Sequence, residues 1–257
     1  MNKKYFFFDI DGTLTDFTTR KIVPSALQTL HQLQENGHFV ALATGRAHYK
    51  ARSFMEEIGL HHMVCSGGGG LVMNDQLIQN ASLPLPQAIA LCKEAEQCGY
   101  GVLLMLDDSI RVYSKNDLFL KQVGERKEPT EYIIDPSLDY DALTAIYKIY
   151  IAISAEEEKQ LKRRDTLGHL RFAKEYLMFQ YDAKEKGILQ MMERLQASIH
   201  DVVVFGDDYN DLCMFDPRWT SIAMGNACEA LKQKATYVSD DAIHDGIKNA
   251  CQHFHWI

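Results

Sequence analysis

No apolar stretch in the 257-residue sequence approaches the 18 residues of a membrane-spanning helix, so we expect no membrane span. The sequence also has no cationic start followed by an apolar segment, so we expect no signal peptide. Its six cysteines form no CxxC pair, which is typical of reduced, mostly buried thiols. The formal net charge of −8 provides no basic surface for nucleic acid. These absences favour a cytoplasmic protein that binds neither nucleic acid nor membrane.

The rest of the composition is that of a globular chain, with 46% hydrophobic and 24% charged residues. Segments typical of strands alternate with segments typical of helices at both ends of the chain, which predicts a parallel sheet. This alternation is interrupted near the proline-containing stretch ASLPLPQA at residues 81–88 and returns near residue 184. We therefore predict an α/β fold. A Rossmann-like, doubly wound parallel-sheet core would comprise residues 1–81 and 184–257, with an α+β domain of residues 82–183 inserted between them.

The stretch YFFFDIDGTLTD at residues 5–16 places two carboxylates directly after an aromatic run. Residues 5–8 have the length and composition of a buried strand bounded by a turn signal. Asp9 would lie where this strand ends, with Asp11 just beyond it, and ligands bind at the carboxyl ends of strands in an open parallel sheet. Taken alone, the same residues also fit a surface turn in which Asp and Gly serve only backbone geometry. The other strand ends therefore decide between the two interpretations.

Two further predicted strands also end in polar residues, at 44–46 (TGR) and at 206–211 (GDDYND). Right-handed crossovers bring such strand ends to one edge of the sheet, so we expect the three loops to converge on one pocket. Carboxylates gathered in one pocket repel each other unless a cation neutralises them. A few hard oxygen ligands, with water and substrate phosphate completing the set, are typical of Mg²⁺. The spacing therefore predicts a magnesium and phosphate site, with one lysine completing the charge neutralisation.

With these motifs, the sequence resembles the Cof-type, subfamily IIB phosphatases of the haloacid dehalogenase superfamily. The matching motifs stand in the family's order along the chain: DIDGT at 9–13, ATGR at 43–46, KG at 186–187 and GDDYND at 206–211. AMGNA at 223–227 also matches the group. The resemblance implies that the inserted residues 82–183 form the cap domain that sets substrate specificity.

Carried over by position, the resemblance implies a role for each acidic residue of the motifs. Asp9 resembles the nucleophile that forms an aspartyl-phosphate, a recognised form of covalent catalysis. Asp11 resembles the general acid and base, and its backbone carbonyl would bind the metal. Asp207 resembles the other protein ligand of the metal, and Asp211 assists it either directly or through other groups. Asp208 is a rival of Asp207, but the GDxxND spacing selects Asp207.

The phosphate contacts implied by the resemblance are Thr44, Gly45, Lys186 and Asn210. We expect Lys186 rather than Lys184 to be the phosphate-binding lysine, because the family's lysine directly precedes a glycine. One departure from the family is the run SGGGG at residues 66–70, where a Ser-Asn-Gly sequence is frequent. The asparagine side chain is missing, although a glycine-rich backbone can still approach a ligand closely.

Together, the motifs predict an Mg²⁺-dependent phosphatase that hydrolyses small phosphomonoesters, such as sugar phosphates or phosphorylated cofactors, through an aspartyl-phosphate. Arg46 would either steer the anionic substrate or form an exposed ion pair. Two alternatives stay open. A phosphomutase or phosphotransferase would share Asp9 and Asp11 and differ in the acceptor, and a non-catalytic phosphate sensor could use the same scaffold. The motifs specify neither the physiological substrate nor the oligomeric state.

Overall fold

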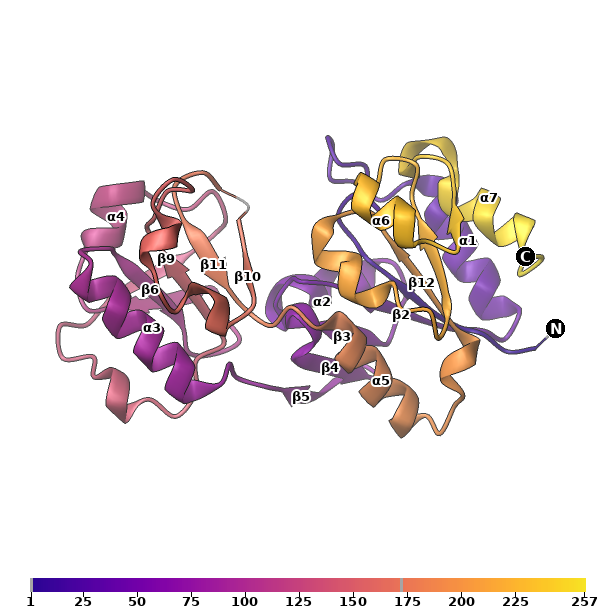
Figure 1. The fold of residues 1–257 in the computed structure, drawn as a ribbon. Helices are drawn as coiled ribbons and strands as arrows, with labels where there is room; N and C mark the ends of the chain where they lie inside the picture. Colours follow the sequence, from indigo (N-terminus) through magenta and orange to yellow (C-terminus); the bar gives the residue numbers. More distant parts are fainter. Residues whose placement is uncertain (1, 172) are drawn as a thin grey trace. The chain divides into compact units, whose positions relative to one another are not determined.

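A computed structural model describes residues 2–171 and 173–257 of the chain. The chain divides into two compact units, Met1–Asn80 with Ala183–Ile257, and Ala81–Asp182. Each junction falls one residue before the boundary predicted from the composition. The inserted unit is drawn with its own strands and helices in Figure 1, and each unit is described by itself below.

The first unit, in its described residues, is built on an eight-stranded sheet with the strand order β14-β13-β12-β1-β2-β3-β4-β5. The strands from β14 to β3 run parallel, and β4 and β5 complete the sheet in antiparallel pairs. The bounds are β1 Tyr5–Phe8, β2 Phe39–Ala43, β3 Met63–Cys65, β4 Gly70–Met73, β5 Gln76–Asn80, β12 Val202–Gly206, β13 Thr220–Ala223 and β14 Tyr237–Val238. The predicted parallel-sheet core of an α/β fold is thus confirmed.

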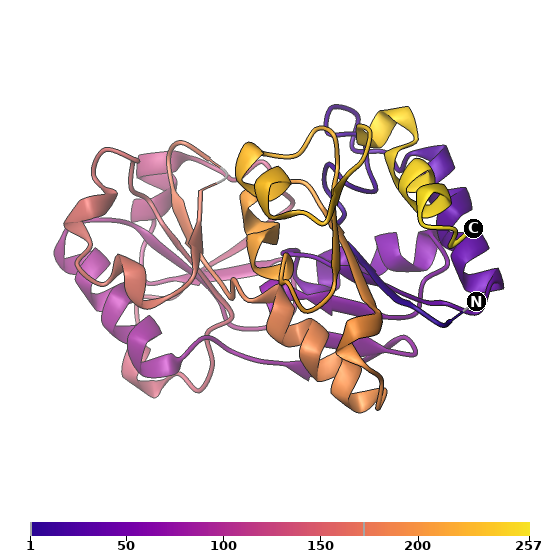
Figure 2. The ribbon, with the colours of Figure 1, turned by 45° about the vertical axis from the view of Figure 1, so that its right-hand side comes forward.

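Helices cover both faces of this sheet because its central strands are apolar on both sides. Phe6 and Phe8 of β1 pack in one hydrophobic cluster, and Phe7 packs in the other. The first cluster receives side chains from α1 (Pro24–Glu35), α2 (His48–Glu57) and α7 (Gly246–His253). The second receives them from α5 (Lys184–Arg194) and α6 (Glu229–Lys234). In Figures 1 and 2, α7 lies beside α1, and α5 lies on the other side of the sheet.

A tight hairpin joins β4 and β5, as the sequence around Asn74-Asp75 predicts. Both turn residues have positive φ, 49° for Asn74 and 63° for Asp75. Two left-handed residues in succession suit a two-residue loop, whose twist matches that of the strands. Asn and Asp adopt this conformation more readily than most other residues.

The second unit, as far as the structure describes it, has a six-stranded sheet with the strand order β10-β11-β9-β6-β7-β8. Its pairs are antiparallel except β7 with β8. The bounds are α3 Leu85–Gln97, β6 Val102–Met105, β7 Arg111–Ser114, α4 Leu118–Val123, β8 Glu131–Ile134, β9 Lys148–Ile151, β10 His169–Leu170 and β11 Leu177–Phe179. Helix α3 packs Leu91 and Ala95 against one face of this sheet. This is the predicted α+β insertion. No described helix is both long and apolar enough to span a membrane.

Candidate active site

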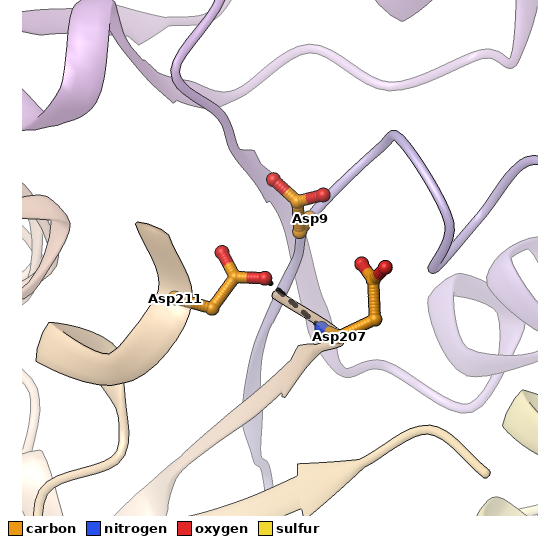
Figure 3. Close-up of side chains that lie close together, drawn as sticks. All are labelled: Asp9, Asp207 and Asp211. Carbon is orange, nitrogen blue, oxygen red and sulfur yellow. Dashed lines mark hydrogen bonds between the residues drawn. The ribbon is translucent and has the colours of Figure 1, made fainter. Parts of the chain in front are cut away.

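Three buried carboxylates meet at the carboxyl ends of neighbouring strands. Asp9 follows β1 directly, and Asp207 follows β12, which pairs with β1 in the sheet. The backbone N–H of Asp9 donates to the carbonyl oxygen of Phe205 at 3.0 Å, which extends this pairing. Asp211 lies in the 3₁₀ turn Tyr209–Met214. One carboxylate oxygen of each aspartate lies within 4.8 Å of the others (Figure 3). Asp9, Asp207 and Asp211 are therefore brought together as the sequence predicted.

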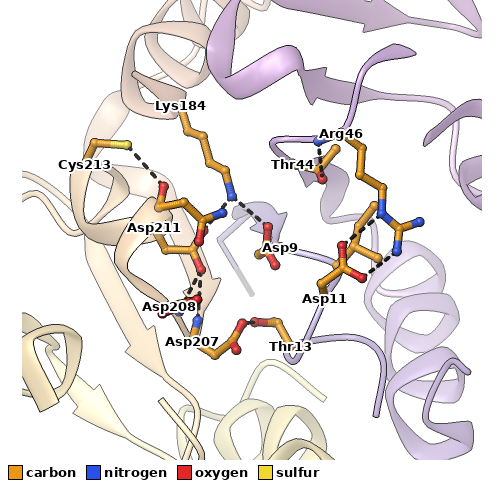
Figure 4. A network of polar contacts seen from close by, with 12 residues as sticks. Asp9, Asp11, Thr13, Thr44, Arg46, Lys184, Asp207, Asp208, Asp211 and Cys213 are labelled. Atoms are coloured by element: carbon orange, nitrogen blue, oxygen red, sulfur yellow. Dashed lines mark hydrogen bonds and ion pairs between the residues drawn. The ribbon is translucent and has the colours of Figure 1, made fainter. Parts of the chain in front are cut away.

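The ammonium group of Lys184 bridges two of these carboxylates. Its Nζ donates to Asp9 Oδ1 at 2.7 Å and to Asp211 Oδ1 at 2.6 Å (Figure 4). The Lys184 side chain is 1% exposed, whereas Lys186 is an exposed residue. The structure therefore places Lys184, and not the predicted Lys186, against the carboxylates. The physical reason is helical geometry, because residues two apart in a helix point to different sides.

A signal for Lys184 was present in the sequence. The apolar residues Ile188, Met191 and Met192 are buried against the sheet. They follow Lys184 at spacings of four, seven and eight residues, which is the periodicity of one helix face. The face that carries Lys184 is therefore the face that packs on the sheet.

The glycine run at residues 67–70 allows this helix to begin close to β3. Gly68 has a φ of 106°, and a Cβ atom built on it would lie 2.2 Å from the carbonyl oxygen of Ala183. The N–H of Ala183 donates to the carbonyl of Gly67 at 2.9 Å. The glycine run thus lets Ala183, the residue before Lys184, lie against the edge of the sheet. Glycine at this point contributes to the position of the lysine, since any side chain there would push the helix away.

The Asp207 carboxylate is fixed by the DIDGT loop. Thr13 Oγ1 donates to Asp207 Oδ1 at 2.8 Å. A Cβ atom on Gly12, whose φ is 89°, would lie 2.2 Å from Asp207 Oδ2. Asn226 Nδ2 donates to the carbonyl of Gly12 at 2.9 Å. The sequence motifs did not indicate these roles of Thr13 and Asn226, although Thr13 lies in DIDGT and Asn226 lies in AMGNA.

Asp211 uses both carboxylate oxygens within its own loop. While Oδ1 accepts from Lys184, Oδ2 accepts from the backbone N–H groups of Asp207 at 3.0 Å and of Asp208 at 3.2 Å. The Asp208 carboxylate is engaged elsewhere, since its Oδ1 accepts from the N–H of Tyr209 at 2.8 Å. Asp207, not Asp208, therefore lies in the carboxylate cluster.

Burial and mutual repulsion change the acidity of the cluster. Burial, followed by the charge of Asp211, raises the pKa of Asp9 to about 7 against the opposing effect of Lys184. Burial and the charges of Asp9 and Asp211 raise the pKa of Asp207 to about 8. Burial would lower the pKa of Lys184, but the charges of Asp211 and Asp9 outweigh it and raise that pKa. The lysine therefore stays charged, but its single positive charge does not neutralise the three carboxylates.

Asp11 lies apart from this cluster and is paired with arginine. Arg46 Nε donates to Asp11 Oδ2 at 2.9 Å, and Arg46 Nη2 donates to Asp11 Oδ1 at 2.6 Å (Figure 4). Arg20 Nη1 donates to Asp11 Oδ1 at 3.2 Å. Burial would raise the pKa of Asp11, but the hydrogen bonds and charge of Arg46, with help from Arg20, lower it below its ordinary value. The predicted metal contact of Asp11 was its backbone carbonyl, and its carboxylate lies outside the cluster.

The other predicted phosphate contacts, Thr44, Gly45 and Asn210, lie at the ends of β2 and β12. Thr44 follows β2 directly, is 1% exposed, and accepts a hydrogen bond at Oγ1 from the N–H of Arg46 at 3.1 Å. Gly45 is half-buried in the same turn. Asn210 is half-buried and precedes Asp211 in the 3₁₀ turn. Because β2 pairs with β1, Thr44 follows the strand next to the one that Asp9 follows.

The charges of the cluster fit one divalent cation. Asp9, Asp207 and Asp211 contribute three negative charges and Lys184 one positive charge, which leaves a net charge of −2. Carboxylate oxygens are hard ligands that suit Mg²⁺, and a site with few protein ligands leaves positions for water and phosphate. Crowded negative charge contributes to the raised pKa values of Asp9 and Asp207, and a cation bound between these carboxylates would favour their ionised forms.

Comparison with known proteins agrees with this geometry. The family model of haloacid dehalogenase-like hydrolases matches residues 6–250. YkrA of Bacillus subtilis, whose name marks it as a candidate phosphatase, is 31% identical over 253 residues, with 97% of each chain covered. The pyridoxal phosphate phosphatase YbhA of Escherichia coli is 24% identical over 268 residues, which cover 96% of this chain and 97% of that protein.

Solved structures give the same assignment. A protein of Geobacillus kaustophilus superposes with a TM-score of 0.83 at 26% identity, with both chains fully covered. The subclass IIB sugar phosphatase BT4131 superposes with a TM-score of 0.80 at 25% identity, over 99% of this chain and 100% of that chain. The chain therefore belongs to the haloacid dehalogenase superfamily and, within it, to the Cof-type subfamily IIB phosphatases that its motifs resemble.

Proposed function

We propose that this chain is an Mg²⁺-dependent phosphatase that hydrolyses small phosphomonoesters through an aspartyl-phosphate on Asp9. The observation that carries the proposal is the buried contact of the Asp9 carboxylate with Lys184, beside Asp207 and Asp211 at the sheet edge. Sugar phosphates and phosphorylated cofactors are the substrate classes that the names of its relatives suggest.

In the first step, a carboxylate oxygen of Asp9 forms a bond to phosphorus while the bond from phosphorus to the ester oxygen breaks. Asp11 donates a proton to the departing oxygen. In the second step, Asp11 takes a proton from water, whose oxygen bonds to phosphorus and displaces the Asp9 carboxylate as inorganic phosphate forms. Little covalent chemistry remains for other residues, so their task is to position and neutralise the phosphoryl group.

Lys184, rather than Lys186, is assigned this neutralising task, together with the Thr44 hydroxyl, Gly45 and Asn210. The Lys184 ammonium already touches the Asp9 oxygen, so it lies within reach of a phosphoryl group attached there. A preorganised charge in a site that excludes water stabilises developing negative charge strongly.

The metal would be held by Asp9, Asp207 and the backbone carbonyl of Asp11, and when bound it would supply positive charge to the phosphoryl oxygens. Asp211 is assigned a positioning role, because its oxygens are used by Lys184 and by the backbone of Asp207. The Arg46 pairing keeps Asp11 ionised, as the water-activating step requires. Protonation of Asp11 for the first step requires this ion pair to weaken.

The inserted residues 82–183 are proposed to discriminate among the alcohol portions of the substrate. The motifs at the sheet edge serve any phosphate ester, and the insertion contains none of them. Exchanging the insertion for that of a relative with a known preference should transfer that preference while hydrolysis of p-nitrophenyl phosphate persists. Retention of the original preference would assign the discrimination to the core.

The test of the proposed function is release of inorganic phosphate from a panel of metabolites, with Mg²⁺ and with a chelator. Metal-dependent release to water supports a phosphatase. Transfer to another alcohol without phosphate release would indicate a phosphotransferase or phosphomutase. Binding of phosphate esters without turnover would indicate a phosphate sensor.

A further inference from the structure

Two guanidinium groups converge on one carboxylate beside the proposed nucleophile. Asp11 receives two hydrogen bonds from Arg46, at 2.6 and 2.9 Å, and one from Arg20 at 3.2 Å. In the described part of the chain, Arg20 and Arg46 each form an ion pair with Asp11. The two guanidinium groups outnumber the one carboxylate that they share, and Lys50 adds a further positive charge near Asp11.

Each arginine lies over an aromatic ring. The Arg20 guanidinium lies over the ring of Phe17, 4.8 Å from its centroid, and the Arg46 guanidinium lies 5.6 Å from the centroid of Phe54. Stacking of this kind fixes a planar cation while leaving its edge available for anions. Less side-chain freedom is then lost when an anion binds.

The backbone at Arg20 supports a role beyond surface charge. Its φ is 59°, in the left-handed region that favours glycine. The turn is closed by hydrogen bonds from Arg20 N to Asp16 O at 2.8 Å and from Asp16 N to Lys21 O at 3.0 Å. An arginine in this conformation costs conformational energy, and such costs are concentrated at functional sites.

We propose that Arg20 and Arg46 select phosphate esters whose alcohol portion carries a second negative charge, either a carboxylate or another phosphate. This proposal rests on the proposed function. Asp11 must come within hydrogen-bond reach of the departing oxygen to protonate it. Because both guanidinium groups touch the Asp11 carboxylate, a substituent one or two bonds beyond that oxygen lies within their reach. Planar guanidinium groups match carboxylate and phosphate geometry in particular.

The test compares three esters of similar size. Phosphoglycolate carries a carboxylate, ethylene glycol bisphosphate carries a second phosphate, and hydroxyethyl phosphate carries a neutral hydroxyl in the same place. We expect kcat/KM for at least one anionic ester to exceed that of the neutral ester by about tenfold or more, the contribution of one charge-assisted hydrogen bond. Comparing kcat/KM for the two anionic esters then shows whether a carboxylate or a second phosphate is preferred. The value for the bisphosphate is first divided by two, because either of its phosphate groups can be hydrolysed.

Charge-removing variants assign the preference to residues. Arg46→Gln and Arg20→Gln should each reduce the ratio of anionic to neutral kcat/KM by several-fold. Arg52→Gln is the matched control, because Arg52 is exposed on α2 and pairs with Glu56 at 2.7 Å. This control removes the same charge and should leave the ratio unchanged. Arg20 has a side chain that is 56% exposed, so its variant decides the question even if Arg46→Gln fails to fold.

Two different failures can be told apart. Equal kcat/KM values for the neutral and anionic esters would overturn the selection by Arg20 and Arg46 and leave the phosphatase assignment intact. An anionic preference that both variants retain would also overturn it. Absence of hydrolysis for all three esters and for p-nitrophenyl phosphate, with Mg²⁺ present, would instead overturn the proposed function on which the inference rests.

Discussion

Lys184 and Asp9 are 175 positions apart in the chain, and the Lys184 Nζ lies 2.7 Å from Asp9 Oδ1. The contact is buried, because the lysine side chain is 1% exposed and that of the aspartate 6%. A buried ion pair costs desolvation free energy and is a weak source of stability. We therefore interpret the pair as an arrangement for chemistry, with an ammonium kept beside the carboxylate that would receive the phosphoryl group.

Replacing each lysine in turn should show whether Lys184 or Lys186 contributes to catalysis. We expect Lys184→Met to lower kcat/KM by about 10²–10³-fold, the range seen when one charge-stabilising donor is removed. Lys186→Met is the matched control and should have little effect, because Lys186 is exposed. Steady-state kinetics with p-nitrophenyl phosphate measures both, and circular dichroism checks the fold. A larger loss in Lys186→Met than in Lys184→Met would restore the assignment predicted from the sequence.

Asp9→Asn should remove turnover without damaging the fold. An amide cannot act as the attacking carboxylate, so single-turnover assays should give no phosphate release and no covalent intermediate by mass spectrometry. The metal-free variant should be at least as stable as the parent, because burial disfavours the ionised form of Asp9. Mass spectrometry must exclude deamidation back to aspartate. Activity in a verified Asp9→Asn sample would rule Asp9 out as the nucleophile.

Asp11→Asn should affect poor leaving groups most. General acid–base catalysis contributes about 10²–10⁴-fold, and we expect a loss of that size in kcat for alkyl phosphates. p-Nitrophenol departs with little need for a proton, so its phosphate ester should show a smaller loss. The affinity for Mg²⁺ should change little, since the metal contact proposed for Asp11 is a backbone carbonyl. An equal loss for both leaving groups would contradict the acid role.

Gly68→Ala should impair catalysis through the position of Lys184. The added methyl group would meet the Ala183 carbonyl at 2.2 Å and push the start of α5 away from the sheet. Gly37→Ala is the matched control, because its φ of 82° is also left-handed but nothing lies within 4 Å of the added atom. Both variants should lose about 1–2 kcal/mol of stability from backbone strain. Only Gly68→Ala should also lose activity, and equal activities would mean that the glycine run does not position the lysine.

Removal of metal should make stability depend on pH. The pKa values of Asp9 and Asp207 are about 7 and about 8 in the fold and 3.8 without it. Between these values the unfolded chain releases protons that the fold retains, so the free energy of unfolding of the chelated protein should fall as pH rises from about 4 to about 8. Above this range the fall should end.

Mg²⁺ should reverse this loss. Binding to the folded protein alone adds about 2.7 kcal/mol at one hundred times the dissociation constant, and the gain should be larger at pH 8 than at pH 5 because the metal competes with protons. Thermal unfolding with chelator and with Mg²⁺ across this pH range provides the measurement. Asp207→Asn is the control, and it should lose most of the Mg²⁺ effect. A chelated protein whose stability does not change across this range would contradict the electrostatic account.

Local patterns in the sequence determined much of the fold. The apolar run of β1 and the Asn-Asp turn before β5 depend on neighbouring residues, and the structure confirms both. The placement of Asp9 and Asp207 followed from the rule that parallel strands end at one edge. That rule needs only strand positions and crossover handedness, so it could be applied without coordinates.

Only the tertiary structure decided which side chains complete the site. Motif spacing favoured Lys186, but the close packing of α5 on the turn at Gly68 turns Lys184 toward Asp9. Likewise, Arg20 reaches Asp11 through a turn whose course depends on a left-handed residue. Spacing along a chain limits which residues can meet. The direction in which each side chain points is determined by contacts between segments far apart in sequence, and these form only when the chain is packed.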